Sequence, residues 1–473
     1  MKTILKFSLI PLLLHALTGH AALTVTNIAQ GCTAAHTLFL KSDGSLWGMG
    51  DNQLGQLGDG TYSGNAPLFG INRPEQIVAS GVTAMAAGSY HSLFLKSDGS
   101  LWATGYNYYG QLGNGKYGTL ATGYGPNRPE QIVASGVTAI AAGFGHSLFV
   151  KSNGSLWAMG LNESGQLGDG TFHNTNRPEQ IVASGVTAIA AGESHTLFLK
   201  SDGSLWAMGE GQLGDGTTHS RTNRPEQIVA SGVTAIAGGS GHSLFLKSDG
   251  SLWGLGPVLG EFKISNRPEQ IVASGVTAIA AGAGHSLFLK SDGSLWGMGD
   301  NTAGQLGSGT LGQFINRPEQ IVPGGVTAIS AGANLVRGGG SGHSLFLKSD
   351  GSLWGMGDND RGQLGDGFTE DYFFNSYVWV GLTSVFIPEQ IYPPPQPVLS
   401  SALSSQTNLQ FNATTGFGGE FQLLGSADPT LPLSQWTPVC TNIITSRHTN
   451  NFSATITNAV NSGSRRFYFL QSQ

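Results

Sequence analysis

Seven histidines recur at one position of a repeated phrase, and imidazole is the side chain that most often titrates or binds metals near neutral pH. A tryptophan follows each of them after 11 residues. Catalysis needs groups held in different environments, whereas seven equivalent copies provide one environment seven times. We therefore expect structural histidines satisfied by backbone partners and tryptophans packed between repeats: His36, His91, His146, His195, His242, His285, His343, Trp47, Trp102, Trp157, Trp206, Trp253, Trp296 and Trp354.

The carboxylates offer little for catalysis. Glu370 and Asp371 form the one adjacent acidic pair outside the repeated phrases, and neighbours on a strand point to opposite faces. Each repeated Asp-Gly turn supplies one carboxylate, whereas calcium takes six to eight oxygens. The Gly-x-Gly segments follow tryptophans and do not open helices. We predict no catalytic residues, no metal site and no cofactor.

The repeated phrase predicts short antiparallel strands. The segment 91–96 alternates with a period of two, Asp98-Gly99 is a strong hairpin signal, and 100–102 begins the return strand. Asn153-Gly154 replaces Asp-Gly in the third repeat and satisfies the same turn chemistry. Apolar segments such as 82–87 and 74–78 add two further strands per repeat. With 72 glycines in 473 residues, the composition also disfavours a mainly helical protein.

Repeat length selects the architecture. The tryptophans are 43 to 58 residues apart, a period typical of propellers, solenoids or arrays. Four strands make one blade, so seven repeats predict an all-β, seven-bladed β-propeller over residues 22–392. Whether one blade is completed from both ends of the chain remains open.

A family resemblance follows from the segment Trp47 to Gly60, which reads WGMGDNQLGQLGDG. It is similar to the tandem repeat of the regulator of chromosome condensation (RCC1) family, a seven-bladed propeller. The Gly-Gln-Leu-Gly core recurs at 110–113, 165–168, 211–214, 304–307 and 362–365, whereas the fifth repeat keeps only Gly256-Pro-Val-Leu-Gly260. The resemblance implies the fold. It leaves function open, because similar propellers serve as exchange factors for a small GTPase, as a light receptor and as a secreted β-lactamase inhibitor.

The first residues resemble an export signal. Lys2 and Lys6 precede an apolar run over 7–17, and Gly19-His20-Ala21 offers small residues for cleavage. We expect residues 1–21 to be removed and the protein to be periplasmic, at the cell surface or extracellular. The apolar run is too short for a membrane span, which needs about 20 residues. Whether Cys32 and Cys440 pair remains open.

Differences between the repeats indicate function better than their shared residues. The segments that vary in length between repeats should emerge on one face of the propeller. They are rich in aromatic residues, which are enriched in the cores of interfaces. We expect them to bind an extracellular or envelope protein, with a glycan less favoured; the competing interpretation packs them onto the propeller. The predicted binding residues are Tyr106, Tyr108, Tyr109, Tyr117, Tyr124, Phe172, Tyr372, Phe373, Phe374, Tyr377 and Trp379.

Other functions are weighed against this one. The net charge of -6, with no basic stripe, argues against nucleic acid binding. A secreted inhibitor similar to the β-lactamase inhibitor is an alternative, as is a guanine nucleotide exchange factor if the export signal is misread. We expect a monomer.

The end of the chain predicts a second domain. Residues 393–398 are proline-rich and read as a stiff linker. Residues 399–473 alternate like strands, with Ser, Thr, Asn and Gly between them, and predict a small β-sandwich-like module.

Overall fold

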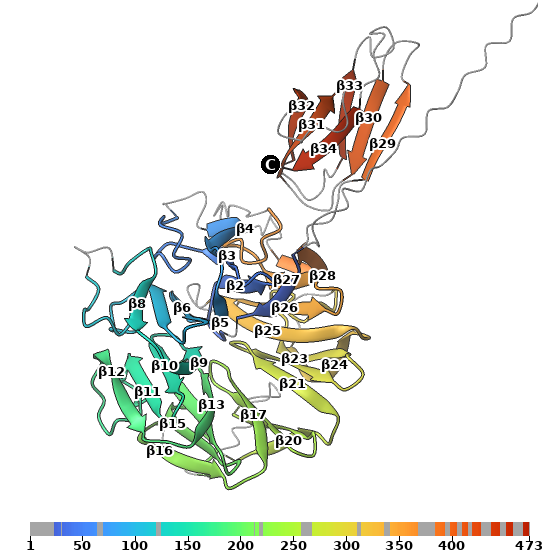
Figure 1. Ribbon diagram of the computed structural model, residues 1–473. Helices are drawn as coiled ribbons and strands as arrows, with labels where there is room; N and C mark the ends of the chain where they lie inside the picture. Colours follow the sequence, from blue (N-terminus) through green and yellow to red (C-terminus); the bar gives the residue numbers. More distant parts are fainter. Residues whose placement is uncertain are drawn as a thin grey trace, which may run out of the picture.

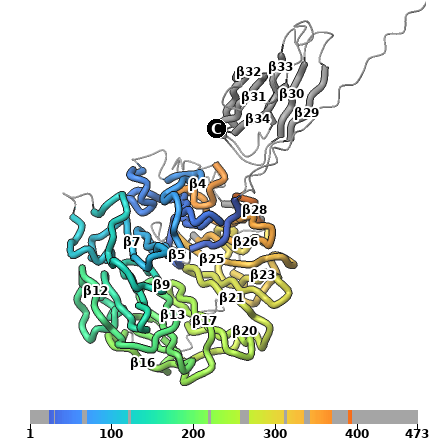
Figure 2. The backbone as a smooth tube through the Cα atoms, in the orientation of Figure 1, coloured from blue at the N-terminus to red at the C-terminus, as the bar shows by residue number. Residues whose placement is uncertain are grey.

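The computed structural model describes residues 23–29, 31–63, 70–119, 124–211, 213–216, 221–256, 267–309, 314–334, 341–367 and 384–392, together with six strands between 398 and 472 (Figures 1 and 2). The expected export signal, the linker residues 393–397 and the predicted binding residues Tyr372, Phe373, Phe374, Tyr377 and Trp379 lie outside the described residues.

Seven four-stranded antiparallel sheets, the blades, follow one another along the chain, and each contains four consecutive strands. Blades 1 to 4 comprise β1 (Val25–Ile28), β2 (His36–Lys41), β3 (Leu46–Asp51) and β4 (Gly70–Val78); β5 (Val82–Ala87), β6 (His91–Lys96), β7 (Leu101–Gly105) and β8 (Glu130–Val133); β9 (Val137–Ala142), β10 (His146–Lys151), β11 (Leu156–Gly160) and β12 (Thr175–Val182); β13 (Val186–Ala191), β14 (His195–Lys200), β15 (Leu205–Glu210) and β16 (Arg221–Val229). Blades 5 to 7 comprise β17 (Val233–Gly238), β18 (Ser243–Lys247), β19 (Leu252–Leu255) and β20 (Glu269–Val272); β21 (Val276–Ala281), β22 (His285–Lys290), β23 (Leu295–Asp300) and β24 (Phe314–Val322); β25 (Val326–Asn334), β26 (Ser341–Lys348), β27 (Leu353–Asp358) and β28 (Ser384–Tyr392).

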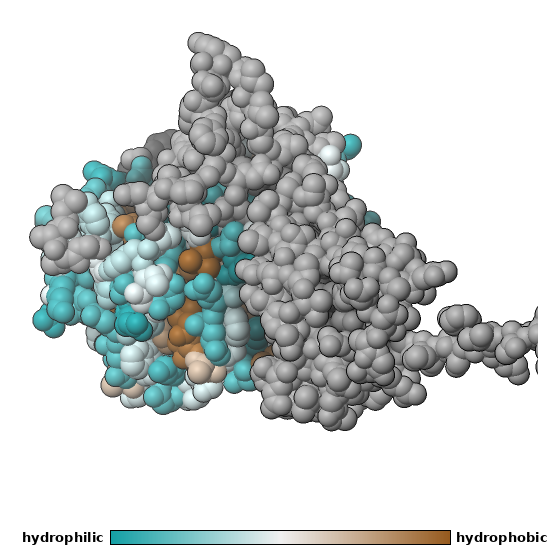
Figure 3. All heavy atoms as spheres, turned by 90° about the horizontal axis from the view of Figure 1, so that it is seen from above, coloured by the Kyte–Doolittle hydropathy of each residue, from teal (hydrophilic) through white to brown (hydrophobic). Residues whose placement is uncertain are grey.

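The blades stand around a common centre with the first strand of each nearest to it (Figure 1). The all-β, seven-bladed prediction is therefore confirmed. On the described surface seen in Figure 3, apolar residues form a narrow stripe flanked by hydrophilic ones. Most apolar area is instead buried between blades, where each core cluster combines side chains of two neighbours.

The ring closes without a shared blade, which answers the question that the repeats left open. β1 pairs with β2 of its own sheet, and blade 1 meets blade 7 face to face. Val25, Ile28 and Phe39 of blade 1 pack with Leu345 and Leu347 of blade 7. Closure therefore uses the same apolar packing as every other junction.

Tyr392 distinguishes this closing junction from the others. It lies opposite Leu353, where the first blade has Val78 opposite Leu46. The Lys41 ammonium lies 3.4 Å from the Trp47 ring centroid and 4.2 Å from that of Tyr392. Because blade 1 supplies the lysine and blade 7 the tyrosine, this cation–π contact ties the last strand to the first blade.

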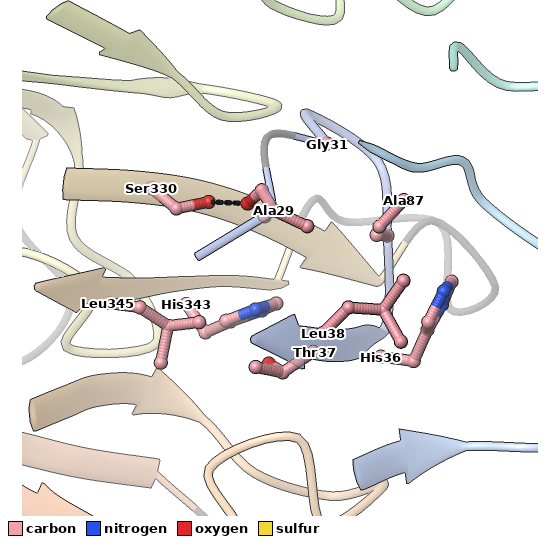
Figure 4. Close-up of a pocket in the computed structure, with 11 residues that line it drawn as sticks. Ala29, Gly31, His36, Thr37, Leu38, Ala87, Ser330, His343 and Leu345 are labelled. Atoms are coloured by element: carbon pink, nitrogen blue, oxygen red, sulfur yellow. Dashed lines mark hydrogen bonds between the residues drawn. The ribbon is translucent and has the colours of Figure 1, made fainter. Parts of the chain in front are cut away.

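Polar contacts near the centre add to the closure (Figure 4). Ser330 Oγ donates to the Ala29 carbonyl at 2.5 Å, and Thr37 Oγ1 donates to the Gln363 carbonyl at 2.8 Å. The cavity between these strands, lined in part by His36 and His343, has a volume of about 10 Å³. It is no larger than one water molecule needs, so it is not a ligand site.

Each blade is stiffened by one repeated aromatic unit. The tryptophan stacks on the phenylalanine opposite it in the second strand, with ring centroids 6.1 Å apart in the Phe198–Trp206 pair. The Lys200 ammonium lies 4.1 Å from the Trp206 centroid, and the indole donates to Ser204 Oγ at 2.9 Å. The half-buried tryptophans also pack against the core clusters between blades, so they serve both their own sheet and a junction.

The histidines join neighbouring blades. At six junctions the imidazole Nε2 lies 2.8 to 3.1 Å from a Ser or Thr hydroxyl of the next blade, as in His91 with Ser147. The Ser147 hydroxyl donates to the Gln111 carbonyl, so Nε2 is the protonated nitrogen. The expected backbone partner is therefore wrong: the partner is a side-chain hydroxyl, which the alternating strand of the next blade directs into the junction.

The connection between β1 and β2 reaches the far side of the ring centre. Cys32 Sγ lies 3.8 Å from the Ala191 carbonyl of blade 4, and Thr33 Oγ1 accepts a hydrogen bond from Ser89 Oγ at 2.6 Å. Cys32 is a buried free thiol, and burial raises its pKa to about 12.

The six remaining strands form two three-stranded antiparallel sheets. One contains β29 (Val398–Leu403), β30 (Leu409–Thr414) and β33 (Asn451–Ile456); the other contains β31 (Gly419–Ser426), β32 (Thr437–Ile444) and β34 (Phe467–Ser472). Two sheets are the layers that a sandwich needs. Over the described residues, no helix is both long and apolar enough to cross a membrane.

Acidification should destabilise the propeller through its histidines. Burial lowers the pKa of all seven repeated histidines to about 3 or 4. Below about pH 6.5 these histidines therefore bind protons in the unfolded chain but not in the native state. Unfolding free energy should therefore fall from pH 6.5 to pH 4. In His91→Gln the slope of the unfolding free energy against pH should be smaller by up to about 1.4 kcal/mol per pH unit. Denaturant unfolding at several pH values measures this slope.

The exposed His173, changed to Gln, is the matched control. Burial raises the pKa of Asp51 to about 6 and of Asp358 to about 8, which favours the native state at low pH and opposes the histidines. Both carboxyls are present in every variant and cancel in the comparison. An unchanged slope in His91→Gln would contradict the assigned role.

Candidate functional site

The meander of each blade sends two connections to the same face of the ring. The connection from first to second strand and the connection from third to fourth strand both emerge there, whereas the Asp-Gly hairpins turn at the opposite face. We call the first of these the loop face. The variable residues of the repeats belong to its connections, so it is the natural place for a site.

A group of six aromatic rings lies on the loop face over blades 2 and 3, and we call it the tyrosine cluster: Tyr90, Tyr106, Tyr108, Tyr109, Tyr124 and Phe144. Tyr106 is central, with four ring neighbours at centroid distances of 5.7 to 6.1 Å. Tyr108 and Tyr109 meet edge to face at 5.2 Å. Tyr108 is 52 % exposed, so the cluster presents a ring to solvent on a half-buried base.

Two buried amides hold the connection that carries Tyr108 and Tyr109. Asn107 Oδ1 accepts from the Leu112 amide at 3.0 Å, and Gln111 Oε1 accepts from the Tyr109 amide at 3.1 Å. Asn52 and Gln56 make the same bonds in blade 1. The repeat therefore supplies a rigid frame on which positions such as 106, 108 and 109 can vary without loss of the loop's shape.

Tyr124 adds backbone strain to the cluster. Its φ is 65°, a left-handed conformation that bulky residues rarely adopt. Its carbonyl accepts from the Asn107 amide at 2.7 Å, and its amide donates to the Thr119 carbonyl at 3.0 Å. These bonds hold the strained residue beside Tyr106. Strain of this kind is concentrated at functional sites.

Burial raises the pKa of three tyrosines of the cluster. Burial, followed by the neighbouring tyrosines, raises the pKa of Tyr106 to about 12. Burial and then the Glu163 carboxylate raise the pKa of Tyr109, and burial and then Asp51 raise that of Tyr90. Within the described part of the chain, none of the five hydroxyls makes a hydrogen bond. A tyrosine hydroxyl can act as both donor and acceptor.

The structure brings together only part of the predicted binding set. Tyr106, Tyr108, Tyr109 and Tyr124 meet in the cluster. Tyr117 and Phe172 instead form an outer row with Tyr62, each leaning on the next blade: Tyr62 donates to the Gly125 carbonyl at 2.9 Å, Tyr117 donates to the Asn174 carbonyl at 3.1 Å, and the Phe172 ring lies under the Arg221 guanidinium at 4.7 Å.

Sequence reasoning missed Tyr90 and Phe144. Both lie in connections between first and second strands, Tyr90 one residue and Phe144 two residues before a repeated histidine. Other repeats mostly have small residues at these two positions, such as Ala35 and Ala34. A comparison of the repeats at both positions would have found these rings, although the connections are too short to look like insertions. The repeated histidines and tryptophans lie at blade junctions, and the described residues contain no group of three or more His, Cys, Asp or Glu that could hold a metal.

Seven blades of consecutive four-stranded sheets, fastened by one repeated phrase, define a β-propeller of tandem repeats. The chain belongs to the RCC1-like domain family, whose model matches residues 113–423, more than half of the chain. RCC1 repeat models match residues 25–56 and 82–111, and 43–95.

Curated relatives match over single stretches of repeats. Human protein RCC2 is 36% identical over 158 residues, which are 32% of this chain and 28% of RCC2. The human E3 ubiquitin-protein ligase HERC2 is 33% identical over 162 residues, 34% of this chain and 3% of HERC2. The chain thus spans under a third of either relative's length.

Solved structures show the same fold at low identity. Human WBSCR16 gives a TM-score of 0.59 at 20% identity, covering 75% of this chain and 96% of that one. Prp20p from Saccharomyces cerevisiae gives 0.60 at 21% identity, covering 75% and 87%. These likenesses concern the fold alone.

The buried rings of the tyrosine cluster should contribute to stability, whereas the exposed ring of Tyr108 should contribute little. Tyr106→Ala removes the ring that four others contact and should lower the free energy of unfolding by about 2 kcal/mol or more. Tyr108→Ala, at a largely exposed ring, should cost less than about 1 kcal/mol. Urea unfolding of both variants checks this; equal losses would contradict the assigned geometry.

Proposed function

We propose that this chain is an exported, non-catalytic RCC1-type propeller that binds a protein partner through the tyrosine cluster. The observation that carries the proposal is the cluster itself: one exposed ring and four further tyrosines, with hydroxyls unused by the described part of the chain, on a rigid base. Tyrosine gives large amphipathic contact area at low entropic cost, and it is enriched where binding energy concentrates.

The position of the cluster supports a protein rather than a small ligand. The rings pack against one another, and the enclosed cavity near the ring centre is far too small for a drug-sized molecule. An exposed group of aromatic rings with polar hydroxyls instead suits the surface of a folded partner. Prp20p, which shares the fold, is described by its binding properties to Gsp1p and histones, so a propeller of this kind can serve as a protein-binding scaffold.

The absence of catalysis is part of the proposal. The seven repeated histidines are buried and neutral at blade junctions, so these imidazoles are not available for acid–base chemistry on the loop face. The likeness to HERC2 covers 3% of that ligase and provides no argument for ligase activity here.

Export is proposed from Lys2, Lys6, the apolar run 7–17 and the small residues before position 22. A reporter that is active only outside the cytoplasm, fused after residue 30, should be exported and cleaved after Ala21. Leu12→Arg should abolish export by breaking the apolar run, whereas Thr3→Ser should not. Mass spectrometry of the reporter's N-terminus reads the cleavage, and an active reporter with Leu12→Arg would contradict the proposal.

Binding is tested by affinity capture from envelope and culture-fluid fractions of the producing cells, followed by titration of the captured protein. Tyr108→Ser should raise the Kd at least about ten-fold, a loss of about 1.4 kcal/mol. Tyr62→Ser, at a ring that is 44 % exposed in the outer row, is the matched control and should change the Kd less than about two-fold. Equal affinity for the native chain and Tyr108→Ser would remove the cluster as the binding face.

A further inference from the structure

We propose that the tyrosine cluster receives a basic, arginine-bearing segment of its protein partner. This inference rests on the proposed function and adds the chemistry of the partner. It follows from three carboxylates that border the cluster on the loop face of blades 3 and 4. We call Glu163, Glu193 and Glu210 the acidic border.

The acidic border lies on the same connections that build the loop face. Glu163 is in the connection between β11 and β12, Glu193 is in that between β13 and β14, and Glu210 ends β15. Glu163 and Glu210 are exposed and Glu193 is half-buried. Glu163 and Glu193 occupy positions that vary between the repeats, as Tyr108 does, whereas Glu210 aligns with the acidic Asp51, Asp300 and Asp358 of other repeats.

Two hydroxyls orient the border. Ser164 Oγ donates to Glu210 Oε2 at 2.5 Å, and Ser240 Oγ donates to Glu193 Oε2. Within the described residues, the other oxygen of each carboxylate accepts no hydrogen bond. Glu193 and Glu210 are therefore each held through one carboxylate oxygen.

The border and the cluster are adjacent. Tyr109 of blade 2 reaches over blade 3, where its ring lies 2.9 Å from the position that a Cβ on Gly145 would occupy. The Glu163 carboxylate is near enough to Tyr109 to raise the pKa of its hydroxyl. A ligand that covers Tyr108 and Tyr109 therefore comes within reach of Glu163.

One cation, Arg221, touches the border directly. The exposed Arg221 stacks on Phe172 at 4.7 Å and donates to the Glu163 backbone carbonyl at 3.0 Å. Arg361 is buried at the closing junction beside Asp360, 4.0 Å away. Arg221 also lies opposite Glu210 in the pairing of β15 with β16, so it offsets part of the border's charge, and the exposed Lys116, Arg177 and Arg224 stand elsewhere on blades 2 to 4. The connections 161–174 and 192–194 themselves contain acidic residues and no lysine or arginine.

Arginine suits such a surface better than other side chains. Its guanidinium stacks on tyrosine rings and also forms bidentate hydrogen bonds with a carboxylate. It is more weakly hydrated than the lysine ammonium, so its desolvation costs less. A negative border beside aromatic rings also raises the association rate of a basic partner and disfavours an acidic one.

The test uses fluorescein-labelled 12-residue peptides of alternating glycine and arginine, or glycine and glutamate, titrated with the purified chain by fluorescence anisotropy. The arginine peptide should bind at least about ten-fold more tightly than the glutamate peptide and weaken when NaCl is raised. Glu163→Gln with Glu210→Gln should raise its Kd at least about five-fold. The control, Glu179→Gln with Glu226→Gln, makes the same charge change on β12 and β16 and should leave the Kd within about two-fold.

Equal binding of the two peptides, or equal losses in the two double variants, would overturn the inference. The same variants applied to the captured partner separate the two proposals. If Tyr108→Ser weakens that partner while Glu163→Gln with Glu210→Gln does not, the binding face stands and the basic-partner inference fails. If Tyr108→Ser has no effect on the captured partner, the proposed face itself fails.

Discussion

Apolar burial between neighbouring blades is the interaction on which the rest of this structure depends. A four-stranded sheet cannot cover both of its faces, so every blade here shares its core with the next, and the ring is complete only when blade 1 meets blade 7. This explains why the closing junction uses Val25, Ile28 and Phe39 in place of a shared sheet. The Lys41 contact with Tyr392 reinforces the one junction whose halves are far apart in sequence.

The polar residues of the repeat make this apolar ring specific. Six of the buried histidines lie within hydrogen-bond distance of a hydroxyl of the next blade through Nε2, and several of these hydroxyls donate to a carbonyl of the first blade, as His91, Ser147 and Gln111 show. Such bonds fix how one sheet is rotated against another, because a displaced blade would leave a buried polar group unpaired. These hydrogen bonds also engage the repeated histidines, which are the side chains that the sequence alone would suggest for catalysis.

A fixed frame leaves a few positions free for function. Asn107 and Gln111 hold their connection through backbone amides, so the shape of the loop does not depend on whether tyrosine, glutamate or alanine stands between them. In blade 2 the positions between these amides carry Tyr108 and Tyr109, with Tyr106 just before Asn107, and in blade 3 the equivalent positions carry Glu163 and Ser164. Membership of the RCC1-like domain family accounts for the fold that supplies this frame.

The sequence by itself determined the strands, their number per repeat and the seven-bladed ring, because a two-residue alternation and Asp-Gly turns are local signals that seven near-copies reinforce. Only the tertiary structure decided how the ring closes, which hydroxyl satisfies each histidine and where Cys32 lies, because these depend on contacts between blades. The candidate site was predicted in part for the same reason. Tyr106, Tyr108, Tyr109 and Tyr124 are near one another in sequence, whereas Tyr90, Phe144 and Glu210 reach the same face only when blades 2, 3 and 4 are placed side by side.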